Sequence, residues 1–342
     1  MPVDPFEMYP LEPQPEEHKK ESLKFQPKDE FYFDHAAALK HSAEWSLNEL
    51  PKQYKKNTEI LDELGLLENS KGERAIKSVD GKTYSYPTVE NIQKYFESMP
   101  NIEMKHAQGF NRLLIVPFGL PIEKIGEAVS KNLIHGIRSG RYLTANGESF
   151  RGDADEDMIM IARSILGERG WGDLKYYPDS FDQKKDSGKT KLEILGGGSS
   201  VQPFPGFHVL LLPETIEMPK EGEGKTVAGR KQFECGMSAE DVLESLKTDP
   251  AFKLECGLTI EDWLLFLAAE TRSTGRLPGC ANDTDFFDVS DLPPSAILLG
   301  NLIGKTDITV WAGWYPRHQT YGVGHLDADD GHDKLCAMTA VK

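Results

Sequence analysis

The last part of the sequence, residues 309–342, constrains the fold and the function more than any other segment. It is rich in Trp, Tyr, His, Asp and Gly. Apolar residues predict a buried strand at each end, around Ile308, Val310 and Trp311 and again around Ala337, Met338, Ala340 and Val341. Between these ends neither helical nor strand periodicity is visible, which predicts a long loop. A loop of this length inside a compact domain is usually functional or disordered, and its aromatic residues argue against disorder. We therefore expect this segment, here called the tail (residues 309–342), to form a binding surface.

The overall charge limits the classes of partner. The 342 residues carry a formal net charge of -16 at pH 7. Nucleic acids and anionic membranes attract positively charged proteins, so we expect no nucleic-acid partner and no direct membrane insertion. No apolar run reaches the roughly 18 to 20 residues of a membrane span, and the first residues lack the pattern of a signal peptide. Display on a cell surface or a virus particle would therefore need another route, and the sequence does not specify the location.

The cysteines do not form a recognisable framework. There are four, at positions 235, 256, 280 and 336, too few and too widely spaced for a disulfide-rich fold or a zinc knuckle. We expect mainly buried thiols, because free cysteine behaves as a small apolar side chain. A bridge between Cys235 and Cys256 stays open as an alternative.

The first hundred residues predict a packing region without chemistry. Residues 1–30 form a Pro- and Glu-rich arm, and residues 31–100 form a helical N-terminal region. Within the helical region, apolar spacing predicts helices at 34–50, 52–67 and 88–99. Asp80-Gly81 marks a hairpin turn.

The remaining residues, 101–342, have the composition of one mixed domain. Apolar runs predict strands, and capped apolar faces predict helices. The expected strands are 112–118, 191–195 and 207–212, and the expected helices are 121–140, 153–168, 238–247 and 259–274. Gly224-Lys225-Thr226 superficially matches a phosphate-binding loop, but Pro219 stands where that motif needs glycine, so we reject a nucleotide site.

The order of these segments resembles a known family. The segments read GKTKLEIL, GFHVLLLPE, EGEGKTVAGRKQFE and SAEDVLESLKTDPAFKLECGLTIEDWLLFLAAE, followed by an apolar strand and the tail. This order is similar to that of the variable proteins of diversity-generating retroelements, in particular the archaeal type found in nanoarchaeal genomes. The likeness covers roughly residues 111–342.

The resemblance implies both a fold and a function. The implied fold is α+β and C-type-lectin-like, with a mixed antiparallel sheet, flanking helices and long loops, here preceded by the helical N-terminal region. The implied function is non-enzymatic recognition of a macromolecular ligand, a protein or the surface of another cell, without a cofactor. In that family, reverse transcription randomises adenines of the template, typically in Asn codons, so the binding residues of the tail vary between copies.

This mechanism sorts the tail into two groups of positions. Randomised Asn codons cannot produce Trp, Gln, Lys or Met, so Trp311, Trp314, Gln319, Lys334 and Met338 are expected to be fixed, with Trp311 in the core. Trp314 is also expected to contact the ligand, together with residues that the randomised codons can encode. The full set of expected contacts is Ala312, Trp314, Tyr315, Arg317, His318, Thr320, Tyr321, His325, Asp327, Asp330, His332 and Asp333.

Other readings of the tail are weaker. Asp327–Gly331 superficially resembles a calcium loop, but Gly331 and His332 occupy the positions where that loop needs an oxygen ligand and a glycine. His318, His325 and His332 recur every seven residues, which would align them for zinc only on a helix that the glycines disfavour.

An enzyme remains the alternative function. The residue types of a nucleophilic site are present in Cys336, His332 and Asp333. Their spacing along the chain does not match that of a known nucleophilic site. Formylglycine-generating enzymes share the implied fold and depend on cysteine or metal, so an enzyme or metal-binding protein of that type is kept as the alternative.

Overall fold

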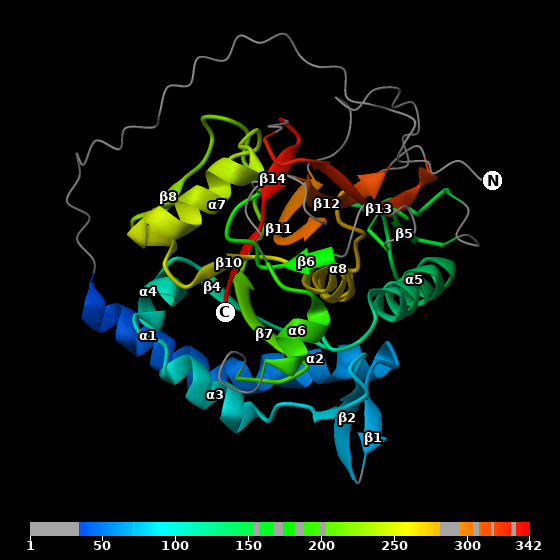
Figure 1. Ribbon diagram of the computed structural model, residues 1–342, viewed down its shortest axis with the longest axis horizontal. Helices are drawn as coiled ribbons and strands as arrows, with labels where there is room; N and C mark the ends of the chain where they lie inside the picture. Colours follow the sequence, from blue (N-terminus) through cyan, green and yellow to red (C-terminus); the bar gives the residue numbers. More distant parts are fainter. Residues whose placement is uncertain are drawn as a thin grey trace.

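The computed structural model places α-helices and β-sheets in one α+β arrangement (Figure 1). It describes residues 34–70, 72–152, 157–163, 165–166, 174–181, 188–197, 203–280, 295–303, 308–315, 318–329 and 333–342. The arm expected at residues 1–30 lies outside the described residues. No helix in the described part of the chain is long and apolar enough to span a membrane.

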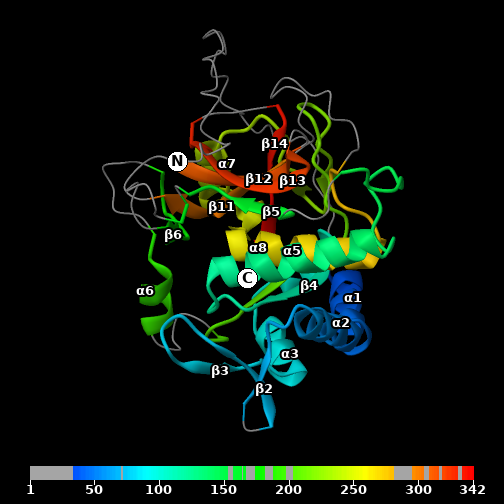
Figure 2. The ribbon, with the colours of Figure 1, turned by 90° about the vertical axis from the view of Figure 1, so that its right-hand side faces the viewer.

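Two helices separate two sheets (Figure 2). The helices are α5 (Ile122–Arg138) and α8 (Ile260–Thr274). The first sheet has the order β14 (Leu335–Ala337), β11 (Ser295–Ile303), β12 (Ile308–Tyr315), β13 (Thr320–Asp327), β5 (Ile159–Ile161), and β6 (Leu174–Tyr176) also pairs with β11. The second sheet has the order β10 (Glu255–Gly257), β15 (Thr339–Val341), β7 (His208–Pro213), β4 (Phe110–Val116).

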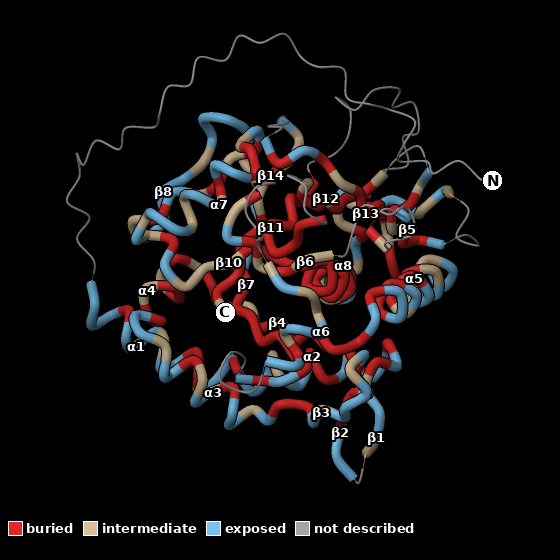
Figure 3. Tube along the Cα trace, in the orientation of Figure 1, coloured by how far each residue is buried: buried red, intermediate tan, exposed pale blue. Residues whose placement is uncertain are grey.

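Helix α8 is the centre of the core, as its sequence predicts. Thr259 and Asp262 form a capping box at its start, and Gly275 ends it with a left-handed backbone at φ 67°. Every residue from Ile260 to Ala268 is buried (Figure 3). A helix buried all round must be covered on all sides, and here the two sheets and α5 provide that cover.

The N-terminal helices pack against the free edge of β4. These helices are α1 (His35–Asn48), α2 (Leu50–Glu63), α3 (Val89–Glu97) and α4 (Ile102–Ala107), and a small sheet of β1 (Glu68–Ser70), β2 (Glu73–Lys77) and β3 (Thr83–Ser85) extends from them. The β2–β3 hairpin turns at the expected Asp80-Gly81. Apolar residues on both sides of residue 100, such as Trp45 and Leu114, belong to one hydrophobic core.

Two expected elements differ from the structure. Residues 191–195, expected as a strand, begin helix α6 (Lys191–Gly196), because Thr190 and Glu193 form a capping box that starts a helix. Within the helix expected at 153–168, the described residues Ile159–Ile161 form strand β5 instead, paired in parallel with Tyr321–Val323 of β13. Tertiary pairing therefore overrides the local pattern there.

The segment between β7 and β10 consists of short elements. It contains β8 (Thr226–Val227), β9 (Arg230–Lys231), α7 (Ala239–Thr248) and the 3₁₀ turn Pro250–Phe252. Gly224-Lys225-Thr226 leads into strand β8, whereas a phosphate-binding loop would lead into a helix. Helix α7 packs on the face of β11 that is opposite to α8, through a cluster that includes Val242, Ile297 and Leu299.

Candidate functional site

The first part of the tail forms a regular β-hairpin, β12 and β13, and not the long loop that the sequence suggests; β14 and β15 follow later in the tail. Strands β12 and β13 have eight residues each and pair in antiparallel register from Ile308↔Asp327 to Tyr315↔Thr320. Three glycines, Gly313, Gly322 and Gly324, interrupt the alternation of apolar and polar residues that would otherwise reveal a strand. The strands expected at the two ends of the segment are confirmed by the start of β12 and by β15 (Thr339–Val341). The expectation of irregular structure between them is wrong for residues 312–315 and 320–327.

The inner face of the hairpin is core. Residues directly opposite each other in an antiparallel pair lie on the same face, so Trp314 and Tyr321 both face the helix layer. Their rings are 5.1 Å apart between centroids, and Tyr321 lies 6.1 Å from Trp263 of α8. The Tyr321 hydroxyl donates to the carbonyl of Pro278 at 2.8 Å, and burial raises the pKa of Tyr321 well above 10.0.

Four of the expected contact residues therefore lie below the surface. Trp314 and Tyr321 are each 1% exposed, and Ala312 and Thr320 are equally buried. Thr320 Oγ1 donates to the carbonyl of Asp157 at 3.0 Å, which uses its polar group inside the protein. A ligand could touch these side chains only after local opening, so the structure corrects their placement on the binding surface.

The outer face of the hairpin is partly covered by Trp311. A Cβ atom on Gly324 would lie 2.7 Å from Trp311 Nε1, so the glycine makes room for the indole ring. Gly313 similarly leaves room for Ser295 of β11, whose Oγ would lie 2.1 Å from such an atom. Trp311 is only half-buried, which corrects the expectation that it is a core residue.

Two clusters of half-buried or exposed residues remain, one at each end of the hairpin. The tip cluster consists of Tyr315 and His318, whose rings stack with centroids 5.0 Å apart and planes 21° apart. Between them, Arg317 lies outside the described residues. Gln319 adopts a left-handed backbone at φ 49°, which turns the chain into β13.

The second cluster lies at the other end of β13. This far-end cluster consists of Asp327, Asp329 and Asp333, all exposed; Asp330 and His332 lie outside the described residues. Seven strand steps, about 23 Å, separate Asp327 from the tip end of β13. His325 lies within β13 and is half-buried. The expected contacts thus form two surfaces and not one, and the exposed Asp329 was not among them.

A disulfide holds the tail near the far-end cluster. Cys235 and Cys336 are joined across 101 residues of sequence, which replaces the alternative pairing of Cys235 with Cys256. Cys256 and Cys280 are free. Cys336 has no free thiol in this state, so it cannot act as the nucleophile of the enzyme alternative.

A chain of polar groups beside β7 and β15 was not anticipated from the sequence; its members His208 and Asp262 are buried, and Tyr177 and Lys342 are half-buried. His208 Nδ1 lies 2.7 Å from Asp262 Oδ1, its Nε2 lies 2.9 Å from the Tyr177 hydroxyl, and Lys342 Nζ donates to the same hydroxyl. Burial alone would raise the pKa of Asp262, but the neighbouring His208, Lys342 and Thr259 amide lower it overall. Burial lowers the pKa of Lys342. These residues come from four separate segments, so no sequence motif could reveal them.

The polar chain acts as a structural link. The side chains of His208 in β7 and Asp262 in α8 are 0% and 1% exposed. A substrate could not reach them without local unfolding. They therefore join the first turn of α8 to β7, and through Tyr177 to the end of β15.

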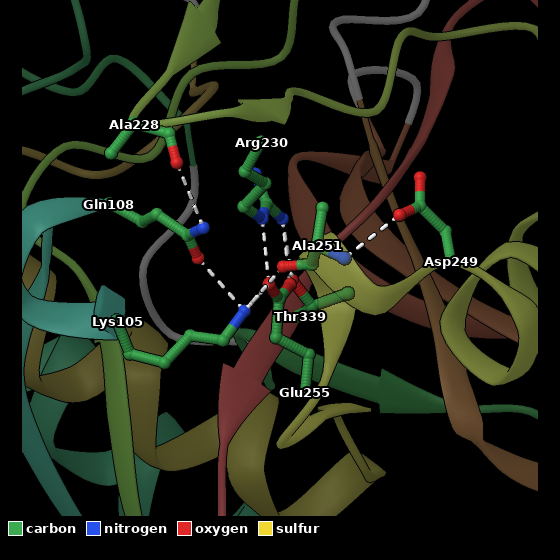
Figure 4. Close-up of polar contacts among 8 residues, drawn as sticks. All are labelled: Lys105, Gln108, Ala228, Arg230, Asp249, Ala251, Glu255 and Thr339. Carbon is green, nitrogen blue, oxygen red and sulfur yellow. Dashed lines mark hydrogen bonds and ion pairs between the residues drawn. The ribbon is translucent and has the colours of Figure 1, made fainter. Parts of the chain in front are cut away.

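A second buried polar cluster anchors β15 from the other side (Figure 4). Glu255 of β10 accepts from Lys105 Nζ at 2.8 Å and from Arg230 Nε at 2.7 Å. Thr339 of β15 donates to the same carboxylate at 2.7 Å, and Lys105 also donates to Gln108 and to the carbonyl of Ala251. Because every donor of Lys105 is used internally, this cluster is a fixed clamp on β10 and β15.

Comparisons with known proteins leave the family open. No family model, no curated protein and no solved structure matches the chain. Among the described residues, no group of three or more His, Cys, Asp or Glu side chains is arranged to hold a metal ion. His332, one of the three histidines considered for zinc, lies outside the described residues.

Proposed function

We propose that this protein is a non-enzymatic recognition protein with a C-type-lectin-like fold. Its ligand is a macromolecule, a protein or the surface of another cell, and it binds at the exposed ends of the β12–β13 hairpin. In this proposal a diversity-generating retroelement varies the residues of the tip cluster and the far-end cluster. The protein works at a cell surface or on a virus particle, where such a ligand is met.

The observation that carries the proposal is the separation of buried and exposed residues within the tail. Ala312, Trp314 and Tyr321 form a packed inner face on α8, whereas Tyr315, His318 and the aspartates stand at the strand ends. Binding residues on loops held by a rigid scaffold can change without loss of the fold. A diversified protein needs this arrangement, because each new sequence must still fold.

The composition of the two clusters also fits recognition. Tyr315 stacked on His318 offers a rigid aromatic contact, and aromatic residues are enriched among the anchors of protein interfaces. Asp327, Asp329 and Asp333 favour a basic or polar patch on the partner. The enzyme alternative has less support, because Cys336 is in a disulfide and His208 is buried.

A display library tests the proposal. The library would randomise the first two bases of Asn codons placed at the half-buried or exposed positions Tyr315, His318, His325, Asp327, Asp329 and Asp333. The matched control library would apply the same codons to the buried positions Ala312, Trp314, Thr320 and Tyr321. Both would be displayed on yeast and selected against lysozyme, a stable basic protein.

We expect most members of the first library to reach the cell surface in folded form and some to bind lysozyme specifically. Most members of the control library should be lost to misfolding. Equal loss of display in the two libraries would contradict the proposal, as would a well-displayed first library that yields no specific binder.

A further inference from the structure

The Cys235–Cys336 disulfide lies where the tail returns to the body of the protein. Cys235 precedes α7, and Cys336 is the central residue of β14. Both cysteines are buried. Strand β14 pairs with β11 over only three residues, Ser295↔Leu335 to Ile297↔Ala337. An edge strand this short gains little stability from its own hydrogen bonds. The disulfide therefore contributes much to holding β14 in position.

The far-end cluster is attached at two points to α7 and the residues before it. Between Asp327 and Asp329, the carbonyl of the buried Ala328 accepts from the Glu240 amide in the first turn of α7 at 3.3 Å, and Ala328 packs in the apolar cluster with Val242. After the cluster, the Leu335 carbonyl accepts from the Gly236 amide at 3.1 Å, next to the disulfide. Helix α7 and the residues before it thus form a platform beside β14 (Figure 1).

The tip cluster has no such dependence. Tyr315 and His318 stand about 23 Å away along β13, and the β12–β13 pairing that carries them is continuous over eight residue pairs. Loss of the disulfide would therefore release β14 and the adjoining Asp333 while the tip cluster keeps its support.

We propose that the Cys235–Cys336 disulfide positions the far-end cluster for ligand binding, so that binding through this cluster requires the oxidised protein. This inference rests on the proposed recognition function. It also assigns the working protein to an oxidising environment, because structural disulfides persist there and are reduced in the cytosol.

The chemistry of the bond is simple. Its formation removes two electrons and two protons from the two thiols, and oxidised glutathione takes them up to give two molecules of reduced glutathione. Cys256 and Cys280 are less reactive in this exchange, because burial raises the pKa of each thiol to about 12.

The first measurement counts thiols. The protein would be purified without reductant, incubated with oxidised glutathione, unfolded in guanidinium with iodoacetamide, and weighed by intact-protein mass spectrometry. We expect two alkyl groups, mapped to Cys256 and Cys280, and four alkyl groups when reductant is added before alkylation. Four groups without reductant, or a bridge mapped to another pair, would overturn the inference.

The second measurement separates the two clusters. One lysozyme-binding clone would be selected with only Tyr315 and His318 randomised, and another with only Asp327, Asp329 and Asp333 randomised. Each clone would then carry Cys235→Ser with Cys336→Ser, and Cys280→Ser would serve as the matched control. We expect the far-end clone to lose affinity by at least about tenfold, because its contacts are no longer pre-organised. The tip clone should change by less than about twofold, since distant sites act independently.

Equal losses in both clones, or no loss in either, would contradict the inference. If no clone can be selected from either library, the proposed recognition function fails. The positioning role is then decided by hydrogen exchange of the double serine variant: faster exchange confined to the amides of 333–337 supports it, and unchanged exchange there overturns it.

Discussion

At the scale of single residues, two tryptophans three positions apart have different surroundings. Trp314 is 1% exposed and packs edge-on against Tyr321 and Phe150, whereas Trp311 lies half-exposed over Gly324. Burial of a large aromatic side chain dominates its contribution to stability. The two positions should therefore respond differently to truncation, although both are expected to be fixed.

We predict that Trp314→Ala lowers the free energy of unfolding by about 3 to 5 kcal/mol, the usual cost of truncating a buried aromatic residue. Trp311→Ala should cost clearly less, because part of its surface is already in water. Urea unfolding followed by circular dichroism measures both. A cost for Trp311→Ala that equals the cost for Trp314→Ala would contradict the description of the outer face.

His208 should make stability depend on pH. Burial lowers its pKa below the usual 6.5, Lys342 lowers it further, and Asp262 opposes both. Between the folded-state pKa and 6.5 the unfolded chain therefore binds more protons than the folded chain. We expect the free energy of unfolding to be greatest above pH 6.5 and to fall as the pH drops below it. The pKa of Asp262 is lowered from 3.8, so the stability that Asp262 contributes is fully present above that value and is lost only as the pH falls below it.

The variant His208→Gln should lack this part of the slope, whereas His135→Gln on the exposed surface of α5 should keep it. Urea titrations at several values between about pH 5 and pH 7 would measure the slope. The same slope in the wild type and in His208→Gln would show that the imidazole does not titrate on unfolding.

At the scale of elements, α2 takes the place of a neighbouring strand beside β4. Asn57 donates to the Leu113 carbonyl at 2.9 Å and accepts from the Ile115 amide at 3.0 Å. Gln53 accepts from the Leu113 amide at 2.6 Å and donates to the Asn111 carbonyl at 2.8 Å. An uncovered edge strand is a template for pairing with another chain, and these two amide side chains close it.

We predict that Asn57→Ala destabilises the protein by about 1 to 3 kcal/mol for each backbone group left buried without a partner. Lys56→Ala, its exposed neighbour on the same helix, should have little effect. Chemical denaturation measures the stability, and light scattering shows whether the freed edge promotes association. Equal stability of the two variants would mean that water satisfies the edge of β4.

The elements with strong local signals could be predicted from the sequence. Helix α8 has a capping box at Thr259 and ends at Gly275, and β4 and β7 contain the apolar runs Leu113–Val116 and Val209–Leu212. Local signals failed where tertiary contacts decide the structure. The hairpin of the tail was hidden because its glycines leave room for Trp311 and Ser295, and β5 exists only through its pairing with β13.

The candidate site was predictable only in part. Codon chemistry separates residues that can vary from residues that cannot, but it says nothing about exposure, so it placed Ala312, Thr320 and Tyr321 among the contacts although they are buried. The disulfide joins residues 101 positions apart, and spacing along the chain gives no information about such a pair. Long-range proximity is a property of the fold.

At the scale of the whole molecule, the described residues form a frame around one hairpin. The polar chain through His208 and the clamp at Glu255 fix β15, the disulfide fixes β14, and α8 supports the strands between them. This division between a fixed frame and replaceable end residues is the central claim of the proposed function. It has a direct genetic consequence.

Sequencing the gene from many cells of its source, together with the flanking DNA, tests this claim most directly. The account predicts a near-copy of the tail coding sequence beside a reverse-transcriptase gene, with adenines in the codons of half-buried or exposed residues such as Tyr315, His318 and Asp327. Variation should concentrate at those codons and spare Trp314 and the buried Tyr321. An invariant tail without such a copy, or variation spread evenly over buried and exposed codons, would contradict it.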